Sequence, residues 1–587
     1  MINKFIGFLF MRSLLFLFIS LSIFPLAAQE VNLPHYLSDR ERDLYKTYQA
    51  APSQSGIAEQ PPVPVRTMAE WEELQGIMIT WTSYPNILSQ IIDHAQEEGL
   101  VYIVCSDSNQ VKNYLLMRNI PLYNLIFLVE PYNSIWCRDY GPWTAYADGY
   151  DSLYFIDWIY NRPRPDDDVI PAAMAAYLQV PLYETTQHPD DLVHTGGNFM
   201  VDGHGRAFSS KLILDENNSK SEAEIDDILF RYMGIQSYVK MDNLPHDAIH
   251  HIDMHMKLLD EETLLVGEYP PGVADGPQIE ANLDYVINNY KTCFGRDYEV
   301  VRIPMPPDQY GRYPDTGGLY RTYTNSVIIN KTVIVPIYEE QYDTTAIRIY
   351  REAMPGYNII GVNCNDIISS GGAIHCITKE IGSRDPLFIS HARIRQAYAQ
   401  QEDYEVWARI RTHTGVEQAV LFWSVDTSQG FIEVPMIPTS NDSFLAAIPG
   451  QAAGSKVYYY LSASSHSGKV ISKPSPAPQG TYRFMVEGTS LVSDPALPAN
   501  QGYILYPAYP NPFNQTTTIT YRLDAPAHVE LSIYNLTGQK IVDLLSAQQA
   551  PGIYRIPWNA ENCASGIYFV RLMVAGQTQY RKLVLIR

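Results

Sequence analysis

Residues 263–269 read TLLVGEY and residues 298–304 read YEVVRIP, with an amphipathic stretch, 279–290, between them. The two apolar runs have the length of buried strands, and the stretch between them has helical spacing. A strand followed by a helix and a second strand is typical of a parallel α/β unit. These residues therefore predict an α/β fold.

The same pattern recurs elsewhere between about residues 67 and 390. Each further copy has an apolar strand, a helix and a second strand, although the copies diverge in sequence. They lie at 332–338, 345–353 and 357–364; at 207–214, 221–233 and 236–241; and at 99–105, 111–117 and 125–129. Repeated units of this kind indicate a closed, repeated α/β architecture.

The pattern changes after about residue 395, where short alternating strands follow one another without helical spacing. They lie at 405–411, 420–424, 431–436, 456–462 and 481–486. Such strands are typical of an immunoglobulin-like β-sandwich, which we place at residues 393–488. A polar linker with prolines, 489–503, then leads into a small all-β module at 504–587.

The N-terminus has the features of a secretory signal peptide, which we place at residues 1–28. Lys4 and Arg12 precede an apolar run, 14–26, and two alanines follow it. This run is shorter than the roughly 20 apolar residues that a membrane-spanning helix needs. We therefore predict an exported chain with no transmembrane segment in its mature form. Residues 29–66 are then an irregular extension or propeptide.

Composition restricts the function further. A chain of 587 residues is too long for one core, and a net charge of −22 argues against a nucleic-acid partner. The six cysteines are scattered and form no CxxC pair, which argues against a zinc ribbon or a dense disulfide framework. They are Cys105, Cys137, Cys293, Cys364, Cys376 and Cys563.

A histidine-rich stretch, HHIDMH at 250–255, carries candidate functional residues. If it is a strand, His251, Asp253 and His255 share one face. That face fits a metal site, or a general base beside a carboxylate. A surface strand with a polar face is the plainer interpretation.

A cysteine lies in the stretch SSGGAIHCIT at 369–378, behind two glycines. The plain interpretation is that Cys376 is a buried thiol in a strand. In a strand the neighbouring His375 points to the opposite face, so it is a poor base for this thiol. His251, arriving from elsewhere in the chain, is the better candidate.

An aromatic-rich stretch, WCRDYGPW at 136–143, places Asp139 among bulky rings. A carboxylate beside Trp136 suits a planar cation, which can stack on the ring and donate to the acid. The plainer interpretation is a surface pair of Arg138 and Asp139 in a packing loop.

Together, these stretches resemble the guanidino-group-modifying enzymes, specifically the agmatine deiminase and Porphyromonas-type peptidylarginine deiminase family. The resemblance covers residues 67–392 and implies a five-bladed α/β propeller with the site at its centre. Five motifs carry it, in this order: Trp136-x-Arg138-Asp139-x-Gly141-Pro142, Gly196-Gly197-Asn198, His251-Ile252-Asp253, Tyr323-Thr324-Asn325 and Gly371-Gly372-x-x-His375-Cys376.

The resemblance also implies roles for these residues. Asp139 and Asp253 would grip the nitrogens of a substrate guanidinium, and Cys376 as a thiolate would attack its central carbon. His251 would protonate the departing ammonia and then activate water, while Asn325 would orient the site. No metal and no cofactor are implied.

The stretch YNRPRP at 160–165 bears on the substrate. Arg162 and Arg164 make a fork for a carboxylate, and a similar pair in the family holds the α-carboxylate of a C-terminal arginine. Agmatine has no carboxylate to offer. Alternatively, the two arginines pair with the acidic run Asp166–Asp168.

The C-terminal module resembles the type IX secretion sorting domain. The similar stretches are YPNPFN at 509–514, VELSIYNLTGQKI at 529–541, GIYFVRL at 566–572 and the basic end. This implies passage through the periplasm and across the outer membrane by the type IX machinery, followed by release or surface association. A plain ligand-binding β-sandwich is the alternative.

The sequence thus predicts a secreted protein-arginine deiminase, a cysteine hydrolase that acts on arginine-containing peptides or proteins, at the C-terminal arginine in particular. The nearest alternative is an agmatine or free-arginine deiminase. Two alternatives are of other classes: a metal-dependent hydrolase that uses His251, Asp253 and His255, and a non-enzymatic adhesin built from the β modules.

Overall fold

A computed structural model describes most of the chain. The described residues are 33–45, 48, 56–147, 152–399, 401–439, 442–488, 503–506, 508, 511, 513–523, 525–536 and 538–586. The predicted signal peptide lies outside them, as do nearly all of the linker 489–503 and Tyr509, Pro510 and Pro512 of YPNPFN.

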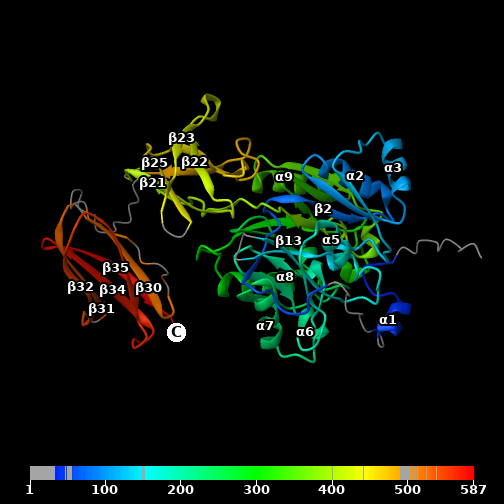
Figure 1. The fold of residues 1–587 in the computed structure, drawn as a ribbon, viewed down its shortest axis with the longest axis horizontal. Helices are drawn as coiled ribbons and strands as arrows, with labels where there is room; N and C mark the ends of the chain where they lie inside the picture. The colour runs from blue at the N-terminus through cyan, green and yellow to red at the C-terminus, as the bar shows by residue number, and fades with distance from the viewer. Residues whose placement is uncertain are drawn as a thin grey trace, which may run out of the picture.

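Five small sheets with a common plan form the region between residues 65 and 382, as far as it is described (Figure 1). Each sheet has a central strand that pairs antiparallel with one neighbouring strand and parallel with another. The sheets are β1 (Val65–Thr67), β5 (Trp143–Ala147), β6 (Ser152–Tyr160), β7 (Leu182–Thr185) and β8 (Val193–His194); β9 (Met200–Val201), β10 (Arg206–Ser210) and β11 (Ser237–Met241); β12 (Met256–Leu258), β13 (Thr263–Glu268) and β14 (Glu299–Pro304); β15 (Val327–Ile329), β16 (Thr332–Ile337) and β17 (Asn358–Asn363); and β18 (Lys379–Gly382), β2 (Leu74–Thr80), β3 (Leu100–Cys105) and β4 (Leu125–Val129).

A helix joins the parallel strands of every one of these sheets, because parallel neighbours cannot be connected by a tight turn. The apolar face of each helix packs on its sheet. In α7 (Glu222–Met233), for example, Ile225, Leu229 and Tyr232 are buried. The predicted strand–helix–strand units and the mixed α/β fold are therefore confirmed. The helices are α2 (Pro85–Ala95), α5 (Ile170–Leu178), α7 (Glu222–Met233), α8 (Gly276–Asn289) and α9 (Glu340–Ala353), with α3 (Ser108–Met117) between β3 and β4.

Two local predictions differ from the structure. The strand predicted at 207–214 ends at Ser210, where the Lys211 N–H donates to the Met241 carbonyl and the short helix α6 (Leu212–Glu216) begins. The extension 29–66 is not irregular throughout, because α1 (Asp39–Tyr45) is a helix. Its start is fixed by Ser38, whose backbone N–H and hydroxyl both donate to the Glu41 carboxylate.

The chain after residue 387 is built from strands, as predicted, with a single short 3₁₀ turn among the described residues there. Two sheets share one core up to residue 487, and two more form the C-terminal module, at the end of the molecule far from α2 and α3 in Figure 1. The strands are β19 (Phe388–Ser390), β20 (Ala397–Tyr398), β21 (Asp403–Arg411), β22 (Val416–Ser424), β23 (Ile432–Pro435), β24 (Ile437–Pro438), β25 (Ser443–Pro449), β26 (Lys456–Ser465), β27 (Val470–Lys473) and β28 (Tyr482–Glu487); then β29 (Tyr503–Leu505), β30 (Thr516–Leu523), β31 (Ala527–Asn535), β32 (Lys540–Gln549), β33 (Gly552–Asn559), β34 (Gly566–Val574) and β35 (Gln577–Leu585).

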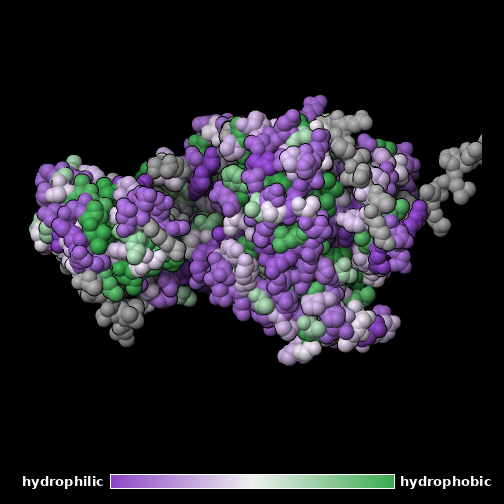
Figure 2. Space-filling view, turned by 90° about the horizontal axis from the view of Figure 1, so that it is seen from below, coloured by the Kyte–Doolittle hydropathy of each residue, from purple (hydrophilic) through white to green (hydrophobic). Residues whose placement is uncertain are grey.

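The first all-β region is fastened to the α/β region by a buried ion pair. The Lys473 ammonium, at the end of β27, lies 2.9 Å from both carboxylate oxygens of Glu261. The face shown in Figure 2 is mainly hydrophilic, with apolar patches over the C-terminal module. None of the described helices is both long and apolar enough to cross a membrane.

The end of α7 gives a test of the packing. Gly234 caps this helix with a φ of 70°, and a Cβ built on it would lie 1.9 Å from the Val65 carbonyl oxygen of β1. Gly234→Ala should therefore lower the free energy of unfolding of the α/β region by about 3 kcal/mol or more. Gly272→Ala is the control: its φ is 101° but the space around it is open, so it should cost only about 1–2 kcal/mol. Differential scanning calorimetry measures both, and equal effects would contradict the contact.

Candidate active site

Most of the residues predicted to form the site lie on five short segments, each just ahead of an antiparallel strand of one of the five sheets. Asp139 lies on α4 (Cys137–Tyr140), ahead of β5, and Asn325 lies two residues ahead of β15. The other three segments are the 3₁₀ turns η1 (Gly196–Asn198), η2 (Ile252–Met254) and η5 (His375–Ile377), ahead of β9, β12 and β18. Because one unit is repeated, five segments that are distant in the sequence lie close together in space.

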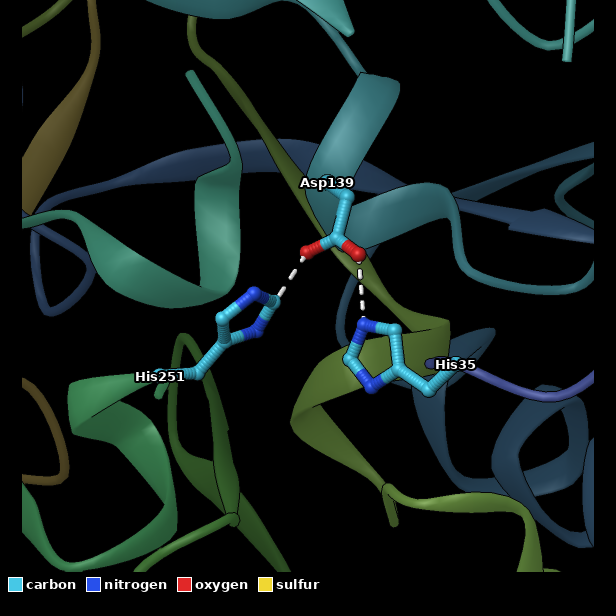
Figure 3. Close-up of side chains that lie close together, drawn as sticks. All are labelled: His35, Asp139 and His251. Atoms are coloured by element: carbon cyan, nitrogen blue, oxygen red, sulfur yellow. Dashed lines mark hydrogen bonds and ion pairs between the residues drawn. The ribbon is translucent and has the colours of Figure 1, made fainter. Parts of the chain in front are cut away.

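Asp139 is fully buried and binds partners through both oxygens. Its Oδ2 lies 2.5 Å from Nε2 of His35, and its Oδ1 accepts a hydrogen bond of 3.1 Å from the Gly197 amide. His251 Nδ1 lies 3.8 Å from the same Oδ1 (Figure 3). Burial alone raises the pKa of a carboxyl group, but the facing imidazoles of His35 and His251 hold the pKa of Asp139 far below its usual range.

Asp253 is the second buried carboxylate, and a histidine orients it. Its Oδ2 lies 2.7 Å from Nδ1 of His375, whose Nε2 lies 3.0 Å from Glu70. Burial raises the pKa of Asp253, while the hydrogen bond and charge of His375 lower it, and the net shift is downward. Oδ1 of Asp253 has no hydrogen-bond partner among the described residues. One carboxylate oxygen is thus left for a further donor.

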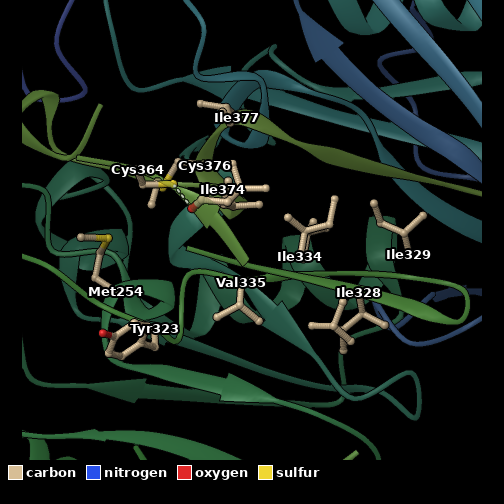
Figure 4. Packing of buried hydrophobic residues seen from close by; sticks show 14 of the residues in the cluster. Met254, Tyr323, Ile328, Ile329, Ile334, Val335, Cys364, Ile374, Cys376 and Ile377 are labelled. Atoms are coloured by element: carbon tan, nitrogen blue, oxygen red, sulfur yellow. Dashed lines mark hydrogen bonds between the residues drawn. The ribbon is translucent and has the colours of Figure 1, made fainter. Parts of the chain in front are cut away.

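Cys376 lies beside this carboxylate and is fully buried, packed among the apolar side chains of Figure 4. Its Sγ is 3.7 Å from Asp253 Oδ2 and accepts a hydrogen bond of 3.2 Å from Asn325 Nδ2. Burial, and then the charges of Asp253 and Asp139, raise the pKa of the Cys376 thiol well above its usual value. A cation bound between the carboxylates would act in the opposite direction.

His251 faces the same space. Its Nδ1 has no hydrogen-bond partner in the described part of the chain, and its Nε2 lies 3.4 Å from the Thr195 hydroxyl. Burial lowers the pKa of His251 to about 3. Gly197 leaves the room that this ring needs, because a Cβ there would lie 2.4 Å from His251 Nδ1.

Trp136 forms a flat wall of the site, and the two glycines ahead of Cys376 let the chain pass close to it. A Cβ on Gly372 would lie 2.8 Å from the Trp136 ring and 2.9 Å from the Cys376 sulfur. Gly371 has a φ of 98°, which disfavours other residues. Gly372 therefore lets the backbone pass close to both the tryptophan and the thiol.

Arg162 and Arg164 are both buried, and neither forms an ion pair with Asp166–Asp168 among the described contacts. The Arg164 Nε donates to Glu41 Oε1 at 2.7 Å, and the Arg162 Nε donates to the His35 carbonyl at 3.0 Å. Both partners belong to the N-terminal extension, a connection that the sequence did not reveal.

The predictions for residues 250–255 and for Cys376 need correction. Neither segment is a strand: η2 and η5 are 3₁₀ turns, and His250 has a φ of 56°, which breaks an extended chain. His375 does not point away into another environment but binds Asp253. The position of His375 next to Cys376 in the sequence gave no indication of this contact.

The alternative metal site also fails on geometry. Among the described residues, the one group of three ligand-type side chains close enough to share an ion is His35, Asp139 and His251. His251, Asp253 and His255 form no such group, and both ring nitrogens of His255 lack partners in the residues described. The proposed ligand set therefore does not converge.

Comparisons with known proteins identify relatives of two parts of the chain. The model of the Porphyromonas-type peptidyl-arginine deiminase family matches residues 66–381, and that of the secretion system C-terminal sorting domain matches residues 507–586. A protein of Vibrio parahaemolyticus named "Putative agmatine deiminase" is 26% identical over 290 residues, 44% of this chain and 79% of its own. A Legionella pneumophila protein of the same name is 24% identical over 339 residues, 53% of this chain and 93% of its own.

A solved structure, the agmatine deiminase of Enterococcus faecalis, is similar with a TM-score of 0.49 and 21% identity, over 56% of this chain and all of that one. The match to the family model defines the class of protein, a hydrolase that deiminates guanidino groups. Because the family model spans more than half of the sequence, the chain belongs to the Porphyromonas-type peptidyl-arginine deiminase family. The type IX sorting domain directs it out of the cell, to the surface or the medium. The predicted family and export are confirmed.

The close approach at Gly197 gives a test of the site geometry. Gly197→Ala would push the His251 ring away from Asp139, so turnover of a guanidino substrate should fall by about a hundredfold. Gly276→Ala is the control, because a Cβ there makes only an ordinary contact, 3.6 Å from the Cβ of Tyr269. A steady-state assay of ammonia release measures both. Unchanged turnover of Gly197→Ala would show that His251 is not needed where it lies.

Proposed function

We propose that this chain is a secreted protein-arginine deiminase that converts peptidyl arginine, the C-terminal arginine in particular, to citrulline and ammonia. The observation that carries the proposal is the buried thiol of Cys376, 3.7 Å from Asp253, in a site where Asp139 and Asp253 have lowered pKa values. A guanidinium is planar and permanently charged, so it can meet both carboxylates at once. We also propose that the five sheets are the blades of a propeller around this site.

The first half of the reaction forms a covalent intermediate. The substrate cation favours the thiolate of Cys376, and the proton that the thiol gives up passes to His251. The sulfur then forms a bond to the central guanidinium carbon. The bond from this carbon to one terminal nitrogen breaks, and the nitrogen leaves as ammonia with the proton of His251. A positively charged thiouronium remains on Cys376.

The second half releases citrulline. Neutral His251 takes a proton from water, and the oxygen of that water attacks the thiouronium carbon. The carbon–sulfur bond breaks and the ureido group of citrulline forms as the hydroxyl proton of the adduct passes to the departing sulfur, which restores the Cys376 thiol. His251 then gives the proton that it took from water to the solvent and is neutral again. Two unpartnered polar atoms, Asp253 Oδ1 and His251 Nδ1, support this scheme because each is free to bind a substrate or water hydrogen.

Asn325 would position the nucleophile. Its Nδ2 donates to the Cys376 sulfur, and its Oδ1 accepts hydrogen bonds from the Ala373 and His375 amides at 3.2 and 3.1 Å. The side chain therefore holds the cysteine turn from both sides and stabilises a negative sulfur. Trp136 would stack on the guanidinium from the opposite wall.

The role of the thiol can be tested directly. Cys376→Ser should lower turnover by about a thousandfold or more, since a hydroxyl is a far weaker nucleophile at neutral pH. Cys364→Ser is the matched control: Cys364 is also buried in the same core, donates to the Val362 carbonyl, and should tolerate the change. Dialysis against a chelator should leave turnover unchanged. Loss of activity there, with an active Cys376→Ser enzyme, would favour a metal-dependent hydrolase instead.

The substrate is the second question, because the curated relatives are named for agmatine. The paired arginines favour a substrate with a carboxylate, and Arg164 does hold one, that of Glu41, in this structure. Agmatine deimination is the alternative function.

A substrate panel separates the two. Formation of the ureido product should be fastest from peptides that end in arginine, slower from the same peptides amidated, and slowest with agmatine. The double variant Arg162→Ala/Arg164→Ala should lose kcat/KM for the free-acid peptide by about thirtyfold or more relative to agmatine. An equal loss for all three substrates would remove the role given to these arginines.

A further inference from the structure

The N-terminal extension enters the site itself. The side chain of His35 is fully buried and faces both Asp139 and His251 (Figure 3). The imidazole stacks on the Trp136 ring with the centroids 4.3 Å apart and the planes within 8°. The rings of His35 and His251 form an edge-on pair, with their centroids 4.8 Å apart.

The His35 ring presents the features of a substrate cation. Its Nε2 lies 2.5 Å from Asp139 Oδ2, and its Nδ1 lies 3.0 Å from the Gly371 carbonyl oxygen. A carbonyl oxygen only accepts hydrogen bonds, and an ionised carboxylate does the same, so the ring satisfies both as the doubly protonated imidazolium. A planar cation therefore lies flat on the tryptophan and donates to Asp139, as a guanidinium would.

The imidazole cannot be consumed by the reaction. Deimination needs an amine that can leave from the attacked carbon, whereas both nitrogens of an imidazole are held in its aromatic ring. His35 thus occupies the cation position without offering a leaving group.

Arg162 and Arg164 donate hydrogen bonds to the backbone of the extension and to a second side chain of it. Arg164 donates to the Pro34 carbonyl at 2.6 Å as well as to the Glu41 carboxylate, and Arg162 donates to the His35 carbonyl. The Leu33 carbonyl accepts from the Trp136 indole at 2.9 Å. A cation at Asp139 and a carboxylate at Arg164 are the two ends of an arginine with a free carboxyl group.

The segment is held by charge and hydrogen bonds more than by an apolar core. In α1 only Glu41 is buried, while Arg42 is exposed and the Leu44 side chain is half exposed. A segment with two charged anchor points and few buried apolar contacts has low local stability and can open without unfolding the domain.

We propose that residues 33–45 are an internal pseudosubstrate, which keeps the exported chain inactive until this segment is displaced or cut away. His35 takes the place of the substrate guanidinium and Glu41 that of the substrate carboxylate. This inference rests on the proposed function, and it adds the regulation of the same site.

The test uses the full chain, with mass spectrometry to show that residues 33–45 are still attached. His35→Ala and Glu41→Gln should each raise citrulline formation about tenfold, since each removes a charge-assisted contact, and the double variant should raise it further. Asp39→Ala, a change at an exposed residue of the same helix, is the matched control and should leave the rate unchanged.

A second readout does not depend on turnover. A cationic haloacetamidine, which alkylates thiols, should label Cys376 slowly in the unsubstituted chain and at least about tenfold faster in the double variant. Peptide mapping locates the label. The synthetic peptide of residues 33–45, added to the double variant, should slow both labelling and turnover.

The outcomes separate this inference from the proposed function. Equal turnover and equal labelling of the unsubstituted chain and the double variant would overturn the pseudosubstrate and leave the deiminase in place. A lower rate in both His35→Ala and Glu41→Gln would also overturn it, because the segment would then assist catalysis. Faster labelling without citrulline from any substrate would support the covering segment but not a deiminase. If the unsubstituted chain is inactive, the variants of the preceding sections are to be compared in the double-variant background.

Discussion

Two carboxylates that remain ionised without solvent require a cation beside them, and the site depends on this requirement. Burial alone raises the pKa values of Asp139 and Asp253, and these values are low because imidazoles of His35, His251 and His375, together with the charge of Arg162, oppose that effect. The same negative charges oppose the thiolate of Cys376. In the proposed mechanism, the nucleophile is therefore weak without a substrate cation and becomes strong when one arrives. Reactivity is then coupled to occupancy by the substrate.

The fold meets this requirement by repetition. Every sheet in the α/β region is preceded by a short turn, and each turn contributes one part of the site: an acid, a pair of glycines, a base with an acid, an amide and a thiol. Turns allow backbone conformations that a strand does not, as at Gly371 with its φ of 98°. Rigid sheets behind the turns fix their positions, so that no loop has to fold over the site to complete it.

The sequence was sufficient for the units of the fold and for most of the site residues. Apolar runs such as TLLVGEY, joined through a helical stretch, are strong local signals, and five motifs in a fixed order are more specific than any one of them. The segment 250–255 was wrongly predicted as a strand because its polar and apolar residues alternate. The left-handed backbone conformation of His250 cannot be read from the sequence, because this residue is not a glycine. His35 could not be found, because its contact with Asp139 joins residues 104 positions apart and no local pattern records it. The contact of Glu41 with Arg164 was missed for the same reason, because these residues are 123 positions apart.

The arginine pair connects latency with substrate choice. Arg164 is buried when the extension is in place, and its charge is compensated by Glu41. When the extension leaves, that compensation is lost, and a buried charge without a partner is costly. A ligand with a carboxylate restores it, whereas agmatine places a cation at Asp139 and offers Arg164 nothing. Under the proposed latency, uncovering the site would therefore favour a substrate with opposite charges at its two ends, the arrangement that Glu41 and His35 imitate.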